Sequence, residues 1–179
     1  MRASSSADRV AAYEAVGRRF ESCLARHFYI MNKHELYMQQ ALAEARKAFD
    51  EGEVPVGAVI VYNDRIIARA HNQIKMLKDP TAHAEMIAIT QAAAQLENER
   101  LNECDLYVTI EPCSMCVGAA ILARLRTIVY GAEDSKTGAC GSAIDLVRPG
   151  LFNHNIEAAK GILEPECRTI IQEFFLAKR

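Results

Sequence analysis

The spacing of apolar and polar positions divides the first half of the chain into a helix and a hairpin. Apolar side chains three and four residues apart predict a helix over residues 34–51, ended by Gly52. The β-rich runs Val56–Tyr62 and Arg65–Ala70 follow, and the Asn63-Asp64 pair between them is typical of a two-residue hairpin turn. The positions expected to face inward on the helix are Leu36, Met38, Ala41, Ala45 and Phe49.

The second half of the chain alternates in the same way. A helix is expected over residues 82–97, with Asp79 or Thr81 as its cap and Pro80 at its entry. Strands alternating with helices predict an α/β layered fold with a partly parallel sheet. The other expected segments are strands at 105–110, 127–130 and 156–162, helices at 112–123 and 164–178, and loops at 73–81 and 132–155, the second with a short helix at 142–147.

The N-terminal segment has its own periodicity. Apolar residues at intervals of three and four predict an amphipathic helix over residues 3–30. Three interpretations stay open: a helix that packs on the body, a transit peptide opposed by its acidic residues, or a gene start placed too early, with Met31 as the true start. We therefore expect an N-terminal extension over residues 1–33 and a folded domain over residues 34–179.

Composition limits the class of protein. Half of the 179 residues are hydrophobic and a quarter are charged, which is normal for one globular domain and excludes disordered, collagen-like and coiled-coil chains. No apolar run reaches the roughly 18 residues that a membrane-spanning helix needs. The start of the chain lacks the apolar core of a secretory signal, so we expect the six cysteines to be reduced and the protein to be cytoplasmic.

Charge is unevenly distributed along the chain. The formal net charge is −2, but residues 1–33 carry six basic and three acidic side chains, which leaves 15 basic against 20 acidic for the rest. A protein of this charge that handles RNA must do so with a local basic patch.

Two short motifs carry the candidate chemistry. His83 together with Cys113 and Cys116 offers one nitrogen and two sulfur ligands, which suit tetrahedral Zn²⁺ and leave its fourth position open, as in catalytic zinc sites. Glu85 lies about 200° from His83 in helical projection, so a shared face requires the looser geometry of a first turn. A carboxylate beside a zinc-activated water can take its proton and return it to a leaving amine, which is the chemistry of hydrolytic deamination.

The two motifs, HAE and PCSMC, resemble the signature of the zinc cytidine/deoxycytidylate deaminase superfamily. Longer strings are similar to the branch of bacterial tRNA-specific adenosine deaminases, and they run in order over about residues 34–179. They are EVPVGAVIV, HN at 71–72, DPTAHAEM, LYVTIEPCSMC, GAEDSKTGACGS, FNHNIE and GILEPEC followed by FF.

This resemblance implies conversion of adenosine to inosine at the wobble position (34) of tRNA, by a homodimer with a three-layer α/β/α cytidine deaminase-like fold and a mixed five-stranded sheet. It implies one Zn²⁺ per subunit, held by His83, Cys113 and Cys116, with Glu85 as proton shuttle. The anticodon arm of tRNA would be the partner, and no membrane is involved. The implied substrate contacts are Asn72 on the purine, the backbone of Ala84, Val56, Asp134 on a ribose or within its own loop, Lys136 on phosphate and Phe175 beside an unstacked nucleotide.

Two rival functions and two ambiguous residues stay open. A related enzyme could act on a free base such as guanine, which the acidic composition of residues 34–179 favours. A non-catalytic protein is the second rival: a closed zinc module would need a fourth ligand, from Cys140 or His154, whereas a redox Cys-x-x-Cys would need none, and Glu85 argues against both. Phe174 belongs either to the core or to the RNA-facing surface, and acidic Glu133 is expected to weaken RNA binding unless the N-terminal extension or the partner subunit compensates.

Overall fold

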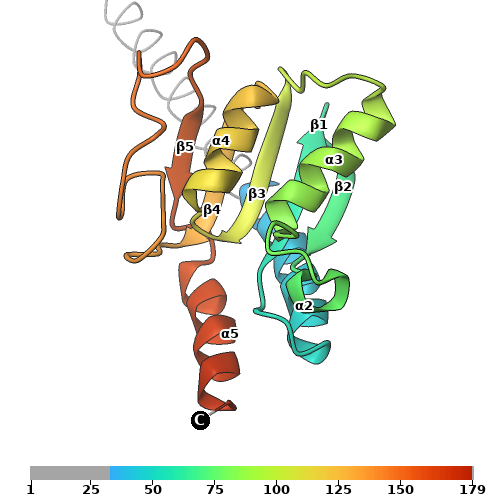
Figure 1. Ribbon diagram of the computed structural model, residues 1–179, viewed down its shortest axis with the longest axis vertical. Helices are drawn as coiled ribbons and strands as arrows, with labels where there is room; N and C mark the ends of the chain where they lie inside the picture. The colour runs from blue at the N-terminus through green and yellow to red at the C-terminus, as the bar shows by residue number, and fades with distance from the viewer. Residues whose placement is uncertain (1–32, 179) are drawn as a thin grey trace, which may run out of the picture. The chain divides into compact units, whose positions relative to one another are not determined.

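Five strands form one mixed sheet in the computed structural model, which describes residues 33–178 (Figure 1). The sheet order is β2-β1-β3-β4-β5, in which β1 pairs antiparallel with β2 and β3, and β4 pairs parallel with β3 and β5. This arrangement confirms the expected mixed five-stranded sheet. The strands are β1 Gly57–Tyr62, β2 Arg65–His71, β3 Cys104–Ile110, β4 Thr127–Ala132 and β5 Glu157–Lys160.

The predicted hairpin joins β1 to β2. Asn63 and Asp64 both have positive φ, 48° and 61°, a conformation that Asn and Asp tolerate and that matches the twist of the two strands. The hydroxyl of Tyr37 donates a hydrogen bond to the carbonyl of Asp64 at 3.0 Å, so the turn is also tied to the preceding helix. Asn72 follows directly after the carboxyl end of β2.

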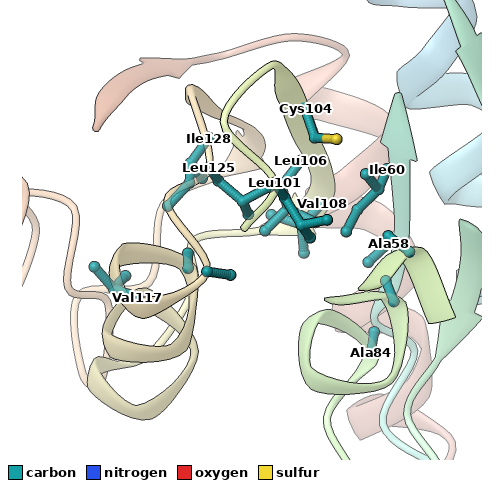
Figure 2. Packing of buried hydrophobic residues seen from close by; sticks show 14 of the residues in the cluster. Ala58, Ile60, Ala84, Leu101, Cys104, Leu106, Val108, Val117, Leu125 and Ile128 are labelled. Carbon is teal, nitrogen blue, oxygen red and sulfur yellow. The ribbon is translucent and has the colours of Figure 1, made fainter. Parts of the chain in front are cut away.

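Helices cover both faces of the sheet. Helices α3 (Ala84–Leu96) and α4 (Ser114–Leu122) pack on one face, where Ala84 and Val117 belong to the same buried cluster as Ile60 and Leu106, all labelled in Figure 2. The helix over residues 33–50 and α5 (Glu164–Leu176) pack on the other face. The three-layer α/β/α fold is thereby confirmed.

Three local predictions are wrong. The expected loop at 73–81 contains the one-turn helix α2 (Ile74–Leu77), and residues 142–147 form turns instead of a helix. Neither Asp79 nor Thr81 caps α3, because the Asp79 carboxylate accepts hydrogen bonds from the backbone and hydroxyl of Thr81.

The remaining predictions concern one helix position, the N-terminal helix and membrane crossing. Leu36 is exposed, unlike the other expected inward positions of its helix. The helix predicted over residues 3–30 lies outside the described residues. No helix within residues 33–178 combines the length and apolarity that crossing a membrane requires.

Candidate active site

Two helix starts bring the three predicted metal ligands together. His83 is the N-cap of α3 and Cys113 is the N-cap of α4, and both have extended backbones. Cys116 lies in the first turn of α4 and is buried. His83 Nδ1 is 3.8 Å from Cys113 Sγ and 3.6 Å from Cys116 Sγ, and the two sulfurs are 3.7 Å apart. Three ligand atoms this close can hold one metal ion.

The protonation of these ligands is strongly coupled. Hydrogen bonds from Cys116 and His83 lower the pKa of the Cys113 thiol to about 3. The same contact with Cys113 raises the pKa of Cys116, and a hydrogen bond to Cys113 raises that of His83. The hydrogen bonds from its neighbours thus favour the thiolate form of Cys113. A metal ion replaces the protons of its ligands when it binds.

Glu85 lies at the same place, against the expectation from helical spacing. Its side chain is buried, burial raises its pKa, and within the described residues Oε2 has no hydrogen-bond partner. The backbone of His83 is extended, with φ −73° and ψ 152°, so the helical rotation of 100° per residue starts only after it. This is why residues two apart can approach one site.

The donor atoms of His83, Cys113 and Cys116 are of the kinds that zinc binds. One imidazole nitrogen and two thiol sulfurs match a three-ligand catalytic site, which keeps one position open. A buried carboxylate oxygen without a partner is costly unless another group binds it. The orphaned Oε2 of Glu85 beside the ligands therefore fits a water held at that open position.

A cavity of about 380 Å³ opens beside His83, Glu85 and Cys113. This volume lies in the range of small-molecule pockets, roughly 300 to 1,000 Å³. Ala84 does not line the cavity; it is fully buried, and its N–H donates to Oδ1 of Asn72. The predicted substrate residues that do line it are Val56, Asn72, Asp134, Lys136 and Phe175.

Six further lining residues were not singled out from the sequence. Five of them are apolar or hydroxyl-bearing residues, which carry no side chain that could bind a metal or move a proton. Glu111 had one usable signal, because it directly precedes Pro112 and Cys113 within the string LYVTIEPCSMC. The six are Val54, Ile74, Ile110, Glu111, Thr137 and Ile171.

The acidic residues after β4 are engaged with neighbours. Glu133 accepts a hydrogen bond from Lys160 Nζ at 2.6 Å, which neutralises its charge locally. Asp134 Oδ1 accepts from the backbone N–H groups of Lys136 at 2.9 Å and Thr137 at 3.3 Å. Asp134 thus holds its own loop, the second of its two expected roles.

The structure distinguishes the alternatives left open for Phe174 and for the fourth-ligand candidates Cys140 and His154. Phe174 is buried with its ring 5.7 Å from that of Phe49, whereas Phe175 is half exposed at the cavity. Among the described residues, neither Cys140 nor His154 joins the ligand cluster, and His154 Nε2 instead lies 2.8 Å from a backbone carbonyl. A closed four-ligand zinc module therefore has no support here.

Known proteins resemble the chain in sequence and in structure. The family model of MafB19-like deaminases matches residues 31–179. The tRNA-specific adenosine deaminase of Bacillus subtilis is 47% identical over 145 residues, which are 81% of this chain and 90% of that protein. A solved structure from a study of A-to-I editing by tRNA:A34 deaminases has a TM-score of 0.71 at 44% identity, covering 75% of this chain and 97% of its own.

A guanine deaminase from Nitrosomonas europaea matches with a TM-score of 0.68, covering 78% of this chain and 83% of its own. At 24% identity that likeness extends to the fold alone. The relatives at higher identity share most of their length with this chain. The chain therefore belongs to the MafB19-like deaminases and, within them, to the family of tRNA-specific adenosine deaminases.

Proposed function

We propose that this protein hydrolyses adenosine to inosine at wobble position 34 of tRNA, consuming water and releasing ammonia. The observation that carries the proposal is the cavity in which the unpartnered carboxylate oxygen of Glu85 lies beside the His83, Cys113 and Cys116 cluster. The 47% identity to a tRNA-specific adenosine deaminase supports tRNA as the substrate class.

In this proposal His83, Cys113 and Cys116 hold one Zn²⁺ per subunit. Zinc, when bound, lowers the pKa of water towards about 7. Glu85 takes a proton at its carboxylate and delivers it to the departing amine, because it lies beside the ligands and makes no other bond through Oε2. Burial raises its pKa, which suits a group that must carry a proton during the reaction.

Asn72 orients the base in this scheme. Its Oδ1 is occupied by the N–H of Ala84, at 2.9 Å, so its two amide N–H donors remain for acceptor atoms of the purine. The side chain of Val56 completes that end of the cavity, and the buried backbone N–H of Ala84 acts only through its hydrogen bond to Asn72. This arrangement selects a base with ring acceptors and does so without a charged group.

The outer rim of the cavity is suited to RNA. Phe175 exposes about half of its side chain there, and an exposed aromatic ring can stack on an unpaired nucleotide. Lys136 lines the same cavity and can neutralise a phosphate of the anticodon arm, with Asp134 shaping the turn that carries it. Phe175 thus supplies an aromatic contact for RNA at this cavity, and Lys136 supplies a basic one.

We further propose a homodimer that forms through the outward face of α4. Leu122 is 83% exposed there, and nothing lies within 4 Å of a Cβ placed on Gly118. Exposed apolar surface beside a small residue allows close approach of a second copy. We also assign residues 34–179 to the deaminase domain and residues 1–33 to an extension. The family match over residues 31–179 supports this division. We expect the enzyme to lie in the cytoplasm with its tRNA.

Incubation of the full, zinc-loaded chain with arginine-accepting tRNA bearing A34, followed by nucleoside mass spectrometry, tests the proposal. Inosine at position 34 is the expected product, and Glu85→Gln should not form it. Turnover of guanine without inosine would favour the free-base deaminase instead. A wild-type chain that turns over neither substrate would contradict an enzymatic role.

A further inference from the structure

Glu111 is a buried side chain that the proposed chemistry does not use. It is 2% exposed at the end of β3, and within the described residues no lysine or arginine pairs with it. Its partners are backbone N–H groups instead. Oε1 accepts from Cys140 at 2.8 Å and Ser142 at 3.1 Å, and Oε2 accepts from Asp134 at 3.1 Å. Both ends of one loop are therefore bound to one carboxyl group.

The backbone around Glu111 joins the same segments. Its N–H donates to the carbonyl of Ala132 at 2.8 Å, where the loop leaves β4. The carbonyl of the next residue, Pro112, accepts from the N–H of Ala139 at 2.9 Å. The loop over residues 133–142 is thus attached directly to the segment that carries Cys113.

Gly138 gives an independent sign that the loop is built around this side chain. A Cβ at Gly138 would lie within 3.0 Å of the Glu111 carboxyl group and of the Asp134 carbonyl. Glycine is the residue that allows the backbone to pass so close to the carboxyl group. A side chain at position 138 would push the loop away from Glu111.

The loop forms one wall of the candidate active site. Asp134, Lys136 and Thr137 line the cavity, and Glu111 lines it from below the loop. We propose that Glu111 is a positioning residue that holds this wall in place and thereby determines how tightly the nucleoside and its flanking phosphate bind. It acts through the loop and takes no part in metal binding or proton transfer. The nature of the substrate rests on the proposed function; the role of Glu111 in the loop does not.

The substitution Glu111→Gln tests this assignment, because it keeps the size of the side chain but turns one acceptor into a donor. The amide NH₂ must then face a backbone N–H, either that of Asp134 or those of Cys140 and Ser142. Glu99→Gln is the matched control, since that side chain is 85% exposed. Gly138→Ala is a second variant, which forces the loop and the Glu111 carboxyl group apart without changing residue 111.

Hydrogen–deuterium exchange of the substrate-free protein is the first readout. Peptides covering residues 133–143 should exchange faster in Glu111→Gln and Gly138→Ala than in the wild type and Glu99→Gln, while α3 stays unchanged. Unchanged exchange in this loop would overturn the assignment. Because no substrate is present, this result holds even if the wild type produces no inosine, which would count against the proposed function alone.

Kinetics with an anticodon stem–loop is the second readout. Because Glu111→Gln loses a hydrogen bond to a buried backbone N–H, we expect its KM to rise about tenfold. We expect kcat to stay within about threefold, because the reacting groups are not displaced. Zinc content should stay at that of the wild type. A fall in kcat at unchanged KM, or loss of zinc, would show that Glu111 supports the metal centre and would overturn the proposal. If Glu111→Gln does not fold, Gly138→Ala must show the same rise in KM.

Discussion

The side-chain oxygen of Asn72 accepts a hydrogen bond from the backbone N–H of Ala84 at 2.9 Å. Ala84 is the first residue of α3, so its N–H has no partner within the helix. Neither residue is appreciably exposed, and the two are 12 positions apart in the chain. Asn72 thus caps the helix from outside and, by the same bond, has its amide group oriented at the cavity.

Removal of this bond should destabilise the fold. Asn72→Ala leaves the buried N–H of Ala84 without a partner, which costs about 1 to 3 kcal/mol of unfolding free energy. Asn98→Ala is the matched control, because Asn98 bonds the N–H of Arg100 at an exposed site. Urea unfolding of both variants measures the difference. Equal losses in the two would contradict a special role for the Asn72 contact.

Glu85→Gln should abolish most of the turnover and leave the metal in place. The amide keeps the size of the side chain but cannot accept and release a proton, so we expect kcat to fall by about 100-fold or more. Inosine formation and zinc content, measured on the same preparation, check this expectation. A variant that retains wild-type kcat would show that another group moves the proton.

His83→Ala and Cys113→Ala should lose zinc and stability together, because metal affinity contributes to the free energy of folding. A chelator should lower the Tm of the wild type and have little effect on these variants. Cys167→Ala serves as the control, since Cys167 is buried outside the ligand cluster. Elemental analysis should find zinc in the control. Wild-type zinc content in His83→Ala and Cys113→Ala would refute the ligand assignment.

Gly57→Ala should be strongly destabilising. A Cβ there would overlap the carbonyl of Ala41 and the N–H of Ala45, where the helix over residues 33–50 packs on β1. Overpacking of this kind costs about 1 to 3 kcal/mol. Gly118→Ala provides the contrast when unfolding is measured at concentrations too low for the proposed dimer, because it lies inside α4 with open space around it in the protomer and should gain about 0.5 to 1 kcal/mol. Thermal unfolding that ranks the two variants the other way would disprove the close packing at Gly57.

Leu122→Glu should convert the proposed dimer to a monomer. Leu122 is 83% exposed on α4, and a charge within a buried interface is costly to desolvate. Leu176→Glu is the matched control, as Leu176 is 66% exposed at the end of α5. Light scattering coupled to size-exclusion chromatography gives the mass of each. Dimers that persist in Leu122→Glu would place the interface elsewhere.

Local signals in the sequence determined most of the secondary structure and the ligand set. The Asn63-Asp64 turn adopts its left-handed conformation because these residue types allow it, whatever lies around them. The apolar spacing of the helices and strands reflects burial on one face, so it can be recognised within a few residues. The donor atoms of His83, Cys113 and Cys116 point to zinc by their chemistry alone.

Only the tertiary structure decided how these pieces meet. The extended backbone of His83 turns Glu85 into the cavity, and Asn72 caps α3 in place of Asp79 or Thr81. The loop after β4 forms no helix at 142–147: Glu111 binds the N–H of Ser142, and the N–H groups of Ala143 and Ile144 bond to the carbonyl of Gly138 instead of in a helical pattern.

The cap on α3 and the bond to Ser142 each rest on a buried polar group whose partner lies far away in the sequence. A buried donor or acceptor must be satisfied by whatever the fold brings near it. The hydrophobic periodicity of a segment does not indicate which distant residue will satisfy its buried polar groups.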